Sequence, residues 1–298
     1  MISPKTKAKL AILLTPLLAL TLWLHSSQAD EPPKTAAPPA NQAAPQRQPT
    51  AQEMLIALQQ EAEAGNPQAM VALGSFFERA DLITRNYGTA LNWYKKAAAK
   101  GSPEGYYFVG LCYEVGAGTK PDLAMAFDNF QKGSNLGSKE ATFKLGQFYL
   151  QGLGVKADPN KGLEMVEKSA KDNYHLALNE LGVINIYGQL ERKKDEKKAL
   201  DYFTKAANLG FSESMRNIAV IYRDGLGRPA NDVQALKWFL LARVYGDQSP
   251  AIQQTILAIR DKLKPEDVTT AEREATVWRD NQVKTAQAAA EAARANRQ

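Results

Sequence analysis

A glycine-rich turn with lysines close behind it is the first feature of this 298-residue chain that could do chemistry. The turn is Gly152-Leu153-Gly154, within the stretch Leu145–Ala170. In a phosphate-binding loop the glycines precede a helix, and a Gly-Lys-Ser/Thr sequence supplies the ammonium and the hydroxyl. Here the glycines follow a predicted helix, no Gly-Lys-Ser/Thr exists, and the Gly-x-Gly pair recurs at residues 116–118 and 225–227. We interpret the feature as a structural turn.

Histidine and cysteine are too scarce for a metal site or a catalytic triad. His25 lies in the apolar N-terminal segment, so His175, at a predicted turn between helices, and Cys112 remain. Zinc sites of the usual type need three or four such ligands, and a lone cysteine allows no internal disulfide. Cys112 falls at an apolar helix position, which predicts a buried and inert thiol. We expect no metal, no cofactor and no catalytic residues.

Carboxylates are the remaining chemical candidates. Two of them facing each other across a groove could support glycoside chemistry, and Glu78, Glu114, Glu180 and Asp224 are the candidates for such a pair. They fall on helix surfaces or helix ends, where a solvated charge is the ordinary state. We therefore predict that the protein is not an enzyme. The alternative hypothesis is a cell-wall glycan-binding or glycan-processing protein that uses groove carboxylates and tyrosines.

The elements that carry these residues repeat along the chain. A small residue recurs at intervals of 36, 36, 36 and 37, at Gly74, Gly110, Gly146, Gly182 and Ala219. Residues that cap helix N-termini recur in step, at Thr50, Asn86, Asp122, Asp158, Asp195 and Asn231. Fifteen residues after each cap stands a residue that tolerates the left-handed conformation, at Gly65, Gly101, Gly137, Asn173, Gly210 and Gly246. A sustained period in this range indicates a solenoid.

Each period predicts two helices. Helix B runs for 14 residues after each cap, and helix A lies between the following glycine and the next cap. The small residue of the first series falls inside helix A, where glycine costs roughly 1 kcal/mol relative to alanine. We expect a close approach of helix B to offset this cost, with small residues facing it at Ala90, Ala126, Gly162, Ala199 and Ala235.

The third period, with Leu145-Gly146, Tyr149, the Gly-x-Gly turn, Asp158 and Lys161, resembles the Sel1-like repeat, a relative of the tetratricopeptide repeat. The first period resembles it through Trp93-Tyr94, Ala97-Ala98 and Gly101. Residues 80–82 lack the glycine turn and Asn185 replaces the tyrosine. The resemblance implies an all-α, right-handed α-solenoid of antiparallel helix pairs over residues 50–282, with capping helices from about residue 250. Residues 283–298 are then a flexible or helical tail.

The same resemblance implies a partner groove lined by helix A. Its positions lie three before, one after and four after the small residue of each repeat. The central candidates are Tyr107, Leu111, Phe143, Gln147, Leu150, Asn179, Val183, Arg216 and Arg223. We expect an apolar middle, an acidic end at Glu78 and Glu114 and a basic end at Arg216 and Arg223. The alternative is that some of these residues pack against the next repeat.

The N-terminus predicts export. Three lysines precede the apolar run Leu10–Leu24, which is shorter than the ~20 residues of a membrane span and is followed by Ser27-Gln28-Ala29. This pattern is typical of a signal peptide of residues 1–29, cleaved after Ala29. An uncleaved inner-membrane anchor is the alternative. Residues 30–49, rich in Pro and Ala, are predicted to be a disordered linker.

Export also removes most of the basic charge. The net charge falls from +5 to +2 without the three leader lysines, so nothing indicates nucleic-acid binding. The sequence also has no Asn-x-Ser/Thr sequon, as expected of a bacterial envelope protein. We predict a periplasmic or secreted scaffold whose partners are proteins or peptides of the cell envelope.

Overall fold

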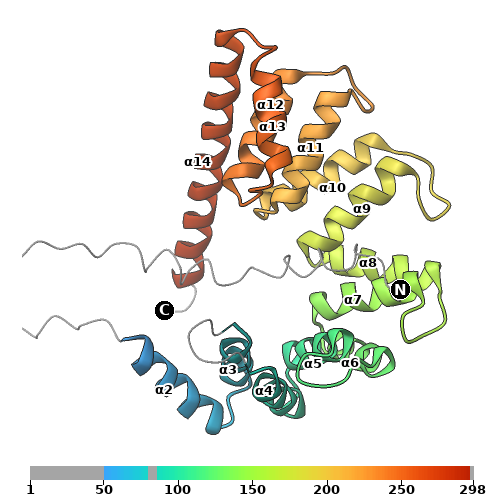
Figure 1. Ribbon diagram of the computed structural model, residues 1–298, viewed down its shortest axis with the longest axis vertical. Helices are drawn as coiled ribbons and strands as arrows, with labels where there is room; N and C mark the ends of the chain where they lie inside the picture. The colour runs from blue at the N-terminus through green and yellow to red at the C-terminus, as the bar shows by residue number, and fades with distance from the viewer. Residues whose placement is uncertain (1–49, 80–85, 296–298) are drawn as a thin grey trace, which may run out of the picture. The chain divides into compact units, whose positions relative to one another are not determined.

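The computed structural model describes residues 50–79 and 86–295, and every regular element in these ranges is a helix (Figure 1). The predicted leader 1–29, the linker 30–49 and residues 80–82 lie outside the described residues. The helices are α2 (Ala51–Glu63), α3 (Pro67–Arg79), α4 (Tyr87–Ala99), α5 (Pro103–Val115), α6 (Leu123–Asn135), α7 (Lys139–Gln151), α8 (Pro159–Lys171), α9 (His175–Tyr187), α10 (Glu196–Asn208), α11 (Ser212–Asp224), α12 (Asp232–Val244), α13 (Pro250–Arg260) and α14 (Pro265–Ala295).

The helices alternate as the sequence predicts. The A helices are α3, α5, α7, α9 and α11, and the B helices are α2, α4, α6, α8, α10 and α12. Each has 13 residues, so the B helices are one residue shorter than predicted because the next residue serves as the C-cap. Figure 1 shows the helices following one another in chain order, each packed on its neighbours. The α-solenoid prediction is confirmed.

The predicted caps are present in all six B helices. The carboxylate of Asp122, for example, accepts a hydrogen bond from the Met125 N–H at 2.9 Å, and Thr50 with Glu53 forms the reciprocal capping box. At the other end, the residue after each C-cap has a positive φ, and this includes Asn173 at 55°. Because asparagine is the residue next best suited to this conformation after glycine, the single substitution in that series keeps the same turn.

The small residue of helix A allows close contact with helix B. A Cβ at Gly110 would lie 2.5 Å from the ring of Phe130, and a Cβ at Gly182 would lie 2.4 Å from Phe203. At Gly146 the nearest groups are instead the Gly162 carbonyl oxygen and the Val166 side chain, both at 2.9 Å. The predicted close approach is confirmed, and in most repeats the ring of helix B, rather than a small residue, occupies the space beside the glycine.

The Gly-x-Gly turn joins neighbouring repeats. Its first glycine ends helix A in the left-handed conformation, as Gly152 does with φ 69°. Its second glycine lies against the first residue of the preceding B helix: a Cβ at Gly154 would be 2.2 Å from the Leu123 carbonyl oxygen, and a Cβ at Gly118 would be 2.3 Å from that of Tyr87. The glycines therefore serve backbone packing, and the interpretation as a turn is confirmed.

The last two helices follow the final repeat, and both contact α12. α14 packs on α12, where the Trp278 ring meets Trp238 with centroids 5.4 Å apart and Tyr245 at 5.8 Å. The Glu274 carboxylate, also on α14, accepts hydrogen bonds from Gln234 and Lys237 of α12. α14 continues as a helix to Ala295, although its residues from 283 onward are exposed. Within the described ranges, no helix combines the length and the apolar character that crossing a bilayer requires.

Candidate partner-binding surfaces

One set of predicted groove residues reaches the surface in every repeat. These residues directly follow the small residue of helix A, and all five side chains are half-buried: Ser75, Leu111, Gln147, Val183 and Val220. We call this set the A-helix stripe. Leu111 and Val183 pack partly against apolar clusters that their own repeats share with the next repeat. Since the five positions are equivalent, the stripe is a continuous feature of the A helices. Leu150, a predicted groove residue of the set four after the glycine, is half-buried as well.

Three other predicted groove residues are buried between repeats. Tyr107, Phe143 and Asn179 are only 4%, 5% and 7% exposed. The Phe143 ring packs against Tyr174 with centroids 5.4 Å apart. The Asn179 side-chain oxygen accepts hydrogen bonds from Ser214 Oγ at 2.8 Å and Asn217 Nδ2 at 2.9 Å, both on α11. These three side chains hold neighbouring repeats together and offer little surface to a partner.

The charged ends of the predicted groove are engaged within the chain. Glu114 forms an ion pair with Lys144 at 2.8 Å, and Glu78 accepts a hydrogen bond from the Tyr94 hydroxyl at 2.8 Å. At the other end, Arg216 pairs with Asp247 at 2.7 Å, and Arg223 pairs with its neighbour Asp224. The ion pairs of Glu114, Arg216 and Arg223 lower the net charge that a partner would meet, so the groove is less polarised than the sequence alone suggests.

His175 and Cys112, the two described residues considered for a metal site or a catalytic triad, both lie in largely apolar surroundings. His175 is the first residue of α9 rather than part of a turn, and its ring lies between Tyr174 and Phe211, at 5.1 and 4.8 Å. Burial and the nearby Lys139 lower the His175 pKa. Cys112 is buried as predicted, and burial, together with Glu78, raises its thiol pKa to about 12. Among the described residues no group of three potential metal ligands comes together.

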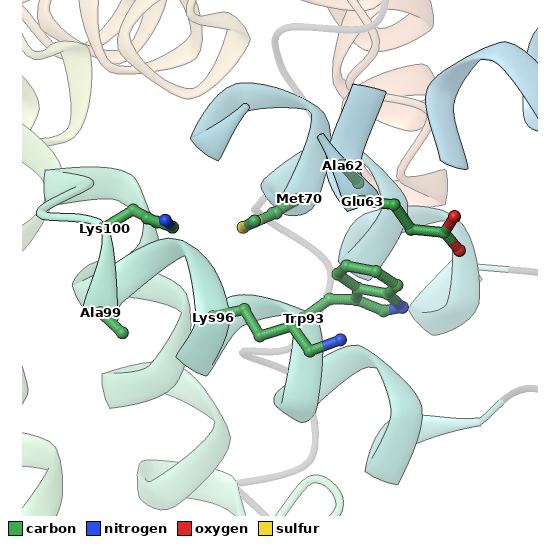
Figure 2. A pocket seen from close by; sticks show the side chains of 7 residues that line it. All are labelled: Ala62, Glu63, Met70, Trp93, Lys96, Ala99 and Lys100. Carbon is green, nitrogen blue, oxygen red and sulfur yellow. The ribbon is translucent and has the colours of Figure 1, made fainter. Parts of the chain in front are cut away.

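A pocket that the sequence interpretation did not single out lies at the start of the solenoid (Figure 2). It has a volume of about 390 Å³ and opens between the end of α2, the start of α3 and α4. Its apolar part consists of Ala62, Met70, Trp93 and Ala99. Glu63, Lys96 and Lys100 supply the charge at this pocket. We call it the α2–α4 pocket.

The side chains of the α2–α4 pocket combine an aromatic surface with positive charge. The Lys96 ammonium lies 3.8 Å from the centroid of the Trp93 ring, a cation–π contact. Figure 2 shows the Met70 and Lys100 side chains pointing toward each other across the pocket. One signal in the sequence could have pointed to this pocket. The positions equivalent to Trp93 in the next three B helices hold Asn129, Met165 and Tyr202, so the tryptophan is unusual among the early repeats.

The chain is similar to known repeat proteins in sequence and in structure. The family model described as Sel1 repeat matches residues 67–102, 103–138, 139–174, 175–211 and 212–243. Among solved structures, a Sel1 repeat protein from Oxalobacter formigenes is similar with 23% identity and a TM-score of 0.62, over 70% of this chain and 60% of that protein. A protective antigen of uropathogenic Escherichia coli with an SLR fold is similar with 27% identity and a TM-score of 0.65, over 80% of this chain and 51% of that protein.

These similarities extend over only part of the relatives. The chain spans 60% and 51% of the two solved proteins, and the first likeness concerns the fold alone. No curated protein matches the chain. The repeat boundaries agree with the helix pairs of the structure, because each matched segment begins at the first residue of an A helix and extends through the following B helix, ending one residue short of its end in the last segment.

Proposed function

The chain belongs to the Sel1 repeat family, and we propose that it is a non-catalytic scaffold of the bacterial cell envelope that binds another protein through its A-helix stripe. Sel1 repeat proteins generally mediate protein–protein interactions and generally lack catalytic activity. The role in the envelope and the stripe as the contact surface are the specific parts of the proposal.

The observation that carries the proposal is the exposure of the A-helix stripe. All five members are half-buried, one on each A helix, and three of them are aliphatic: Leu111 on α5, Val183 on α9 and Val220 on α11. A row of apolar side chains with polar neighbours such as Gln147 suits an extended peptide or the apolar face of a helix. Because Tyr107, Phe143 and Asn179 are used between repeats, the accessible part of the predicted groove is the stripe with Leu150, followed by the ion-paired Arg216 and Arg223.

The envelope location is supported by the N-terminal sequence. The lysines before Leu10–Leu24 and the small residues of Ser27-Gln28-Ala29 favour cleavage of an export signal. Protein purified from the producing bacterium is expected to begin at Asp30 and to be found in the periplasmic or secreted fraction. A chain that begins at Met1 and sediments with the inner membrane would support the anchored alternative.

The scaffold proposal is tested with a variant at the centre of the stripe. Gln147→Arg adds bulk and charge without emptying the core, so it is expected to weaken binding of any stripe partner at least about tenfold. Partners are captured from envelope extract with the wild-type chain and purified, and calorimetry measures the affinity of each. Circular dichroism confirms that the variant is folded.

Asn135→Arg is the matched control. Asn135 is an exposed residue of the B helix α6, and the substitution makes the same chemical change as at Gln147. This variant is expected to keep the wild-type affinity. If Gln147→Arg binds every partner as tightly as Asn135→Arg does, the stripe is not the contact surface.

The glycan alternative receives no support from a specific observation. It needs groove tyrosines and carboxylates, but Tyr107 is buried and Glu114 is paired with Lys144. Saturable binding of the purified chain to cell-wall polymer, without any protein partner, would favour it over the scaffold.

A further inference from the structure

The first and last repeats of the solenoid share a set of residues. A shift of 145 residues aligns α2, α3 and α4 with α10, α11 and α12, end for end. Under this shift Ala62 corresponds to Ala207, Met70 to Met215 and Trp93 to Trp238. Three of the four apolar residues of the α2–α4 pocket are therefore repeated at the C-terminal end, and the fourth, Ala99, corresponds to another apolar residue, Val244.

At the C-terminal end this surface is covered by a helix of the same chain. Trp278 of α14 packs on Trp238 and on Tyr245, and Trp238 is only 7% exposed. One turn later, the Gln282 Nε2 donates to the side-chain oxygen of Asn208 on α10, at 3.4 Å. Asn208 corresponds to Glu63 of the pocket. The C-terminal repeat thus shows how a helix with one aromatic side chain occupies this surface.

At the N-terminal end no described element covers the corresponding surface, and the α2–α4 pocket is open there. Trp93 is half-buried, whereas its counterpart Trp238 is buried beneath α14. The intervening repeats carry Asn129, Met165 and Tyr202 at this position, so tryptophan occurs only in the first and last. The volume of about 390 Å³ lies at the small end of the range for binding pockets, which suits one large side chain.

The two ends differ in charge. Lys96 and Lys100 of the pocket correspond to the apolar Leu241 and Tyr245 at the C-terminal end. There, Arg279 of α14 lies beside Leu241 and Val244 and acts electrostatically on Tyr245. A helix seated in the same way on α4 would bring the residue equivalent to Arg279 next to the two lysines.

We propose that the α2–α4 pocket binds an α-helix of a partner protein that carries an aromatic side chain with an acidic residue directly after it. The aromatic side chain takes the place that Trp278 takes at the C-terminal end, against Trp93 and Met70. The carboxylate pairs with Lys96 and Lys100. The proposal rests on the proposed scaffold function and adds a second contact surface, with its own specificity, to the A-helix stripe.

Charge complementarity also decides against a second copy of this chain as the occupant. The α14 of another copy would place Arg279 against Lys96 and Lys100, and like charges in contact oppose binding. The ion pair of Arg279 with its neighbour Asp280, at 2.9 Å, offsets only part of this repulsion, because Asp280 lies one residue further along the helix than the position next to Trp278. An acidic residue in place of Arg279 would turn this repulsion into attraction. The charge at this one position of the helix therefore distinguishes the two occupants.

The test uses a fluorescent peptide of residues 265–283 of this chain that carries Arg279→Glu. Fluorescence anisotropy with the full-length protein is expected to show saturable binding, and Trp278→Ala in the peptide is expected to abolish it. The unmodified peptide is expected to bind at least about tenfold more weakly. Tighter binding of the unmodified peptide would identify a second copy as the occupant and would overturn the proposal.

Protein variants place the binding in the pocket. Lys96→Glu with Lys100→Glu changes only exposed residues, so the fold is expected to remain intact while affinity for the Arg279→Glu peptide falls at least tenfold and affinity for the unmodified peptide rises. The matched control is Lys132→Glu with Lys168→Glu, which reverses the charge at the positions equivalent to Lys96 in the next two repeats. Equal effects of the two double variants, or no saturable binding of the Arg279→Glu peptide, would overturn the proposal.

The Gln147→Arg variant distinguishes binding at the α2–α4 pocket from binding at the A-helix stripe. It is expected to bind the Arg279→Glu peptide like the wild type, because the pocket and the stripe share no residue. Failure of the peptide to bind would remove the pocket proposal and would leave the stripe to its own test.

Discussion

Gly110 and Phe130 show how closely the two helices of a repeat approach each other. The Phe130 ring is fully buried, and a methyl group on Gly110 would lie 2.5 Å from it, well inside the 3.5–4.0 Å of a normal carbon contact. The sequence predicted that a close approach offsets the helical cost of this glycine. The structure shows that the ring of Phe130 is the group that lies against this glycine.

Gly110→Ala is therefore expected to destabilise the protein. Overpacking costs about 1–3 kcal/mol, while alanine returns roughly 1 kcal/mol of helix propensity, so the expected net loss in urea unfolding is up to about 2 kcal/mol. The control is Gly88→Ala in α4, where the nearest atom to the new Cβ is the Asn86 side-chain oxygen at 3.5 Å. It is expected to leave the unfolding midpoint unchanged or to raise it. A Gly110→Ala protein more stable than the wild type would contradict this account.

The buried thiol of Cys112 is expected to make stability depend on pH in the alkaline range. Its pKa rises from 9.0 to about 12 because burial, and then Glu78, disfavour the thiolate. Below pH 9 both states keep the proton, so the thiol has no effect. Above pH 9 the unfolded state loses the proton while the folded state keeps it, and the free energy of unfolding falls by up to ~1.4 kcal/mol per pH unit.

Urea unfolding between pH 8 and 10.5 measures this effect. Lysines and tyrosines titrate in the same range, so the relevant quantity is the difference in slope between the wild type and Cys112→Ala. The variant is expected to start lower, because it loses packing, and to lose less stability as the pH rises. Parallel slopes would show that Cys112 is accessible to water in the folded state.

At the scale of elements, the Gly-x-Gly turn connects two repeats through the backbone. The sequence showed that the motif recurs after helix A, and local chemistry was enough to interpret it as a turn. It did not show why the second glycine is needed. The tertiary contact gives the reason, because Gly118 lies against the Tyr87 carbonyl group at the start of α4.

Alanine substitutions at two glycines can distinguish the effect of this contact from the effect of the left-handed backbone conformation. Gly118 and Gly101 both have left-handed φ, at 72° and 81°, but only Gly118 has a neighbour within reach of a new Cβ. Gly101→Ala is expected to cost about 1–2 kcal/mol, the conformational penalty alone. Gly118→Ala is expected to cost more, and thermal unfolding compares the two. Equal losses would mean that the second glycine of the turn is required only for its conformation.

At the scale of the whole molecule, α14 covers the last repeat. In a solenoid each repeat is stabilised by its neighbours, so a terminal repeat needs a cap. Trp278 contributes to this cover through its packing on Trp238 and Tyr245, which was not predicted, since the sequence indicated only capping helices from about residue 250.

Trp278→Ala is expected to destabilise the C-terminal repeat in particular. Truncating a fully buried tryptophan costs about 3–5 kcal/mol, and for the half-buried Trp278 we expect about 2–3 kcal/mol. Hydrogen exchange is expected to accelerate in α12 and to remain unchanged in α5. A chain that ends at Gln282 is expected to melt like the wild type, because the α14 residues beyond it are exposed. Uniform acceleration across all repeats would contradict a local capping role.

The sequence by itself determined the repeat, the caps and the turns, because each depends on backbone conformation and hydrogen bonds within a few residues. Asp122, Asp158 and Asn173 take the roles predicted for them for this reason. Only the tertiary structure decided which helix-A residues are available to a partner, since Tyr107 and Leu111 lie one turn apart on α5, yet Tyr107 is buried and Leu111 is half-buried. The α2–α4 pocket also depends on three helices at once, and its likeness to the site of Trp278 becomes visible only where α14 covers one of the two equivalent surfaces.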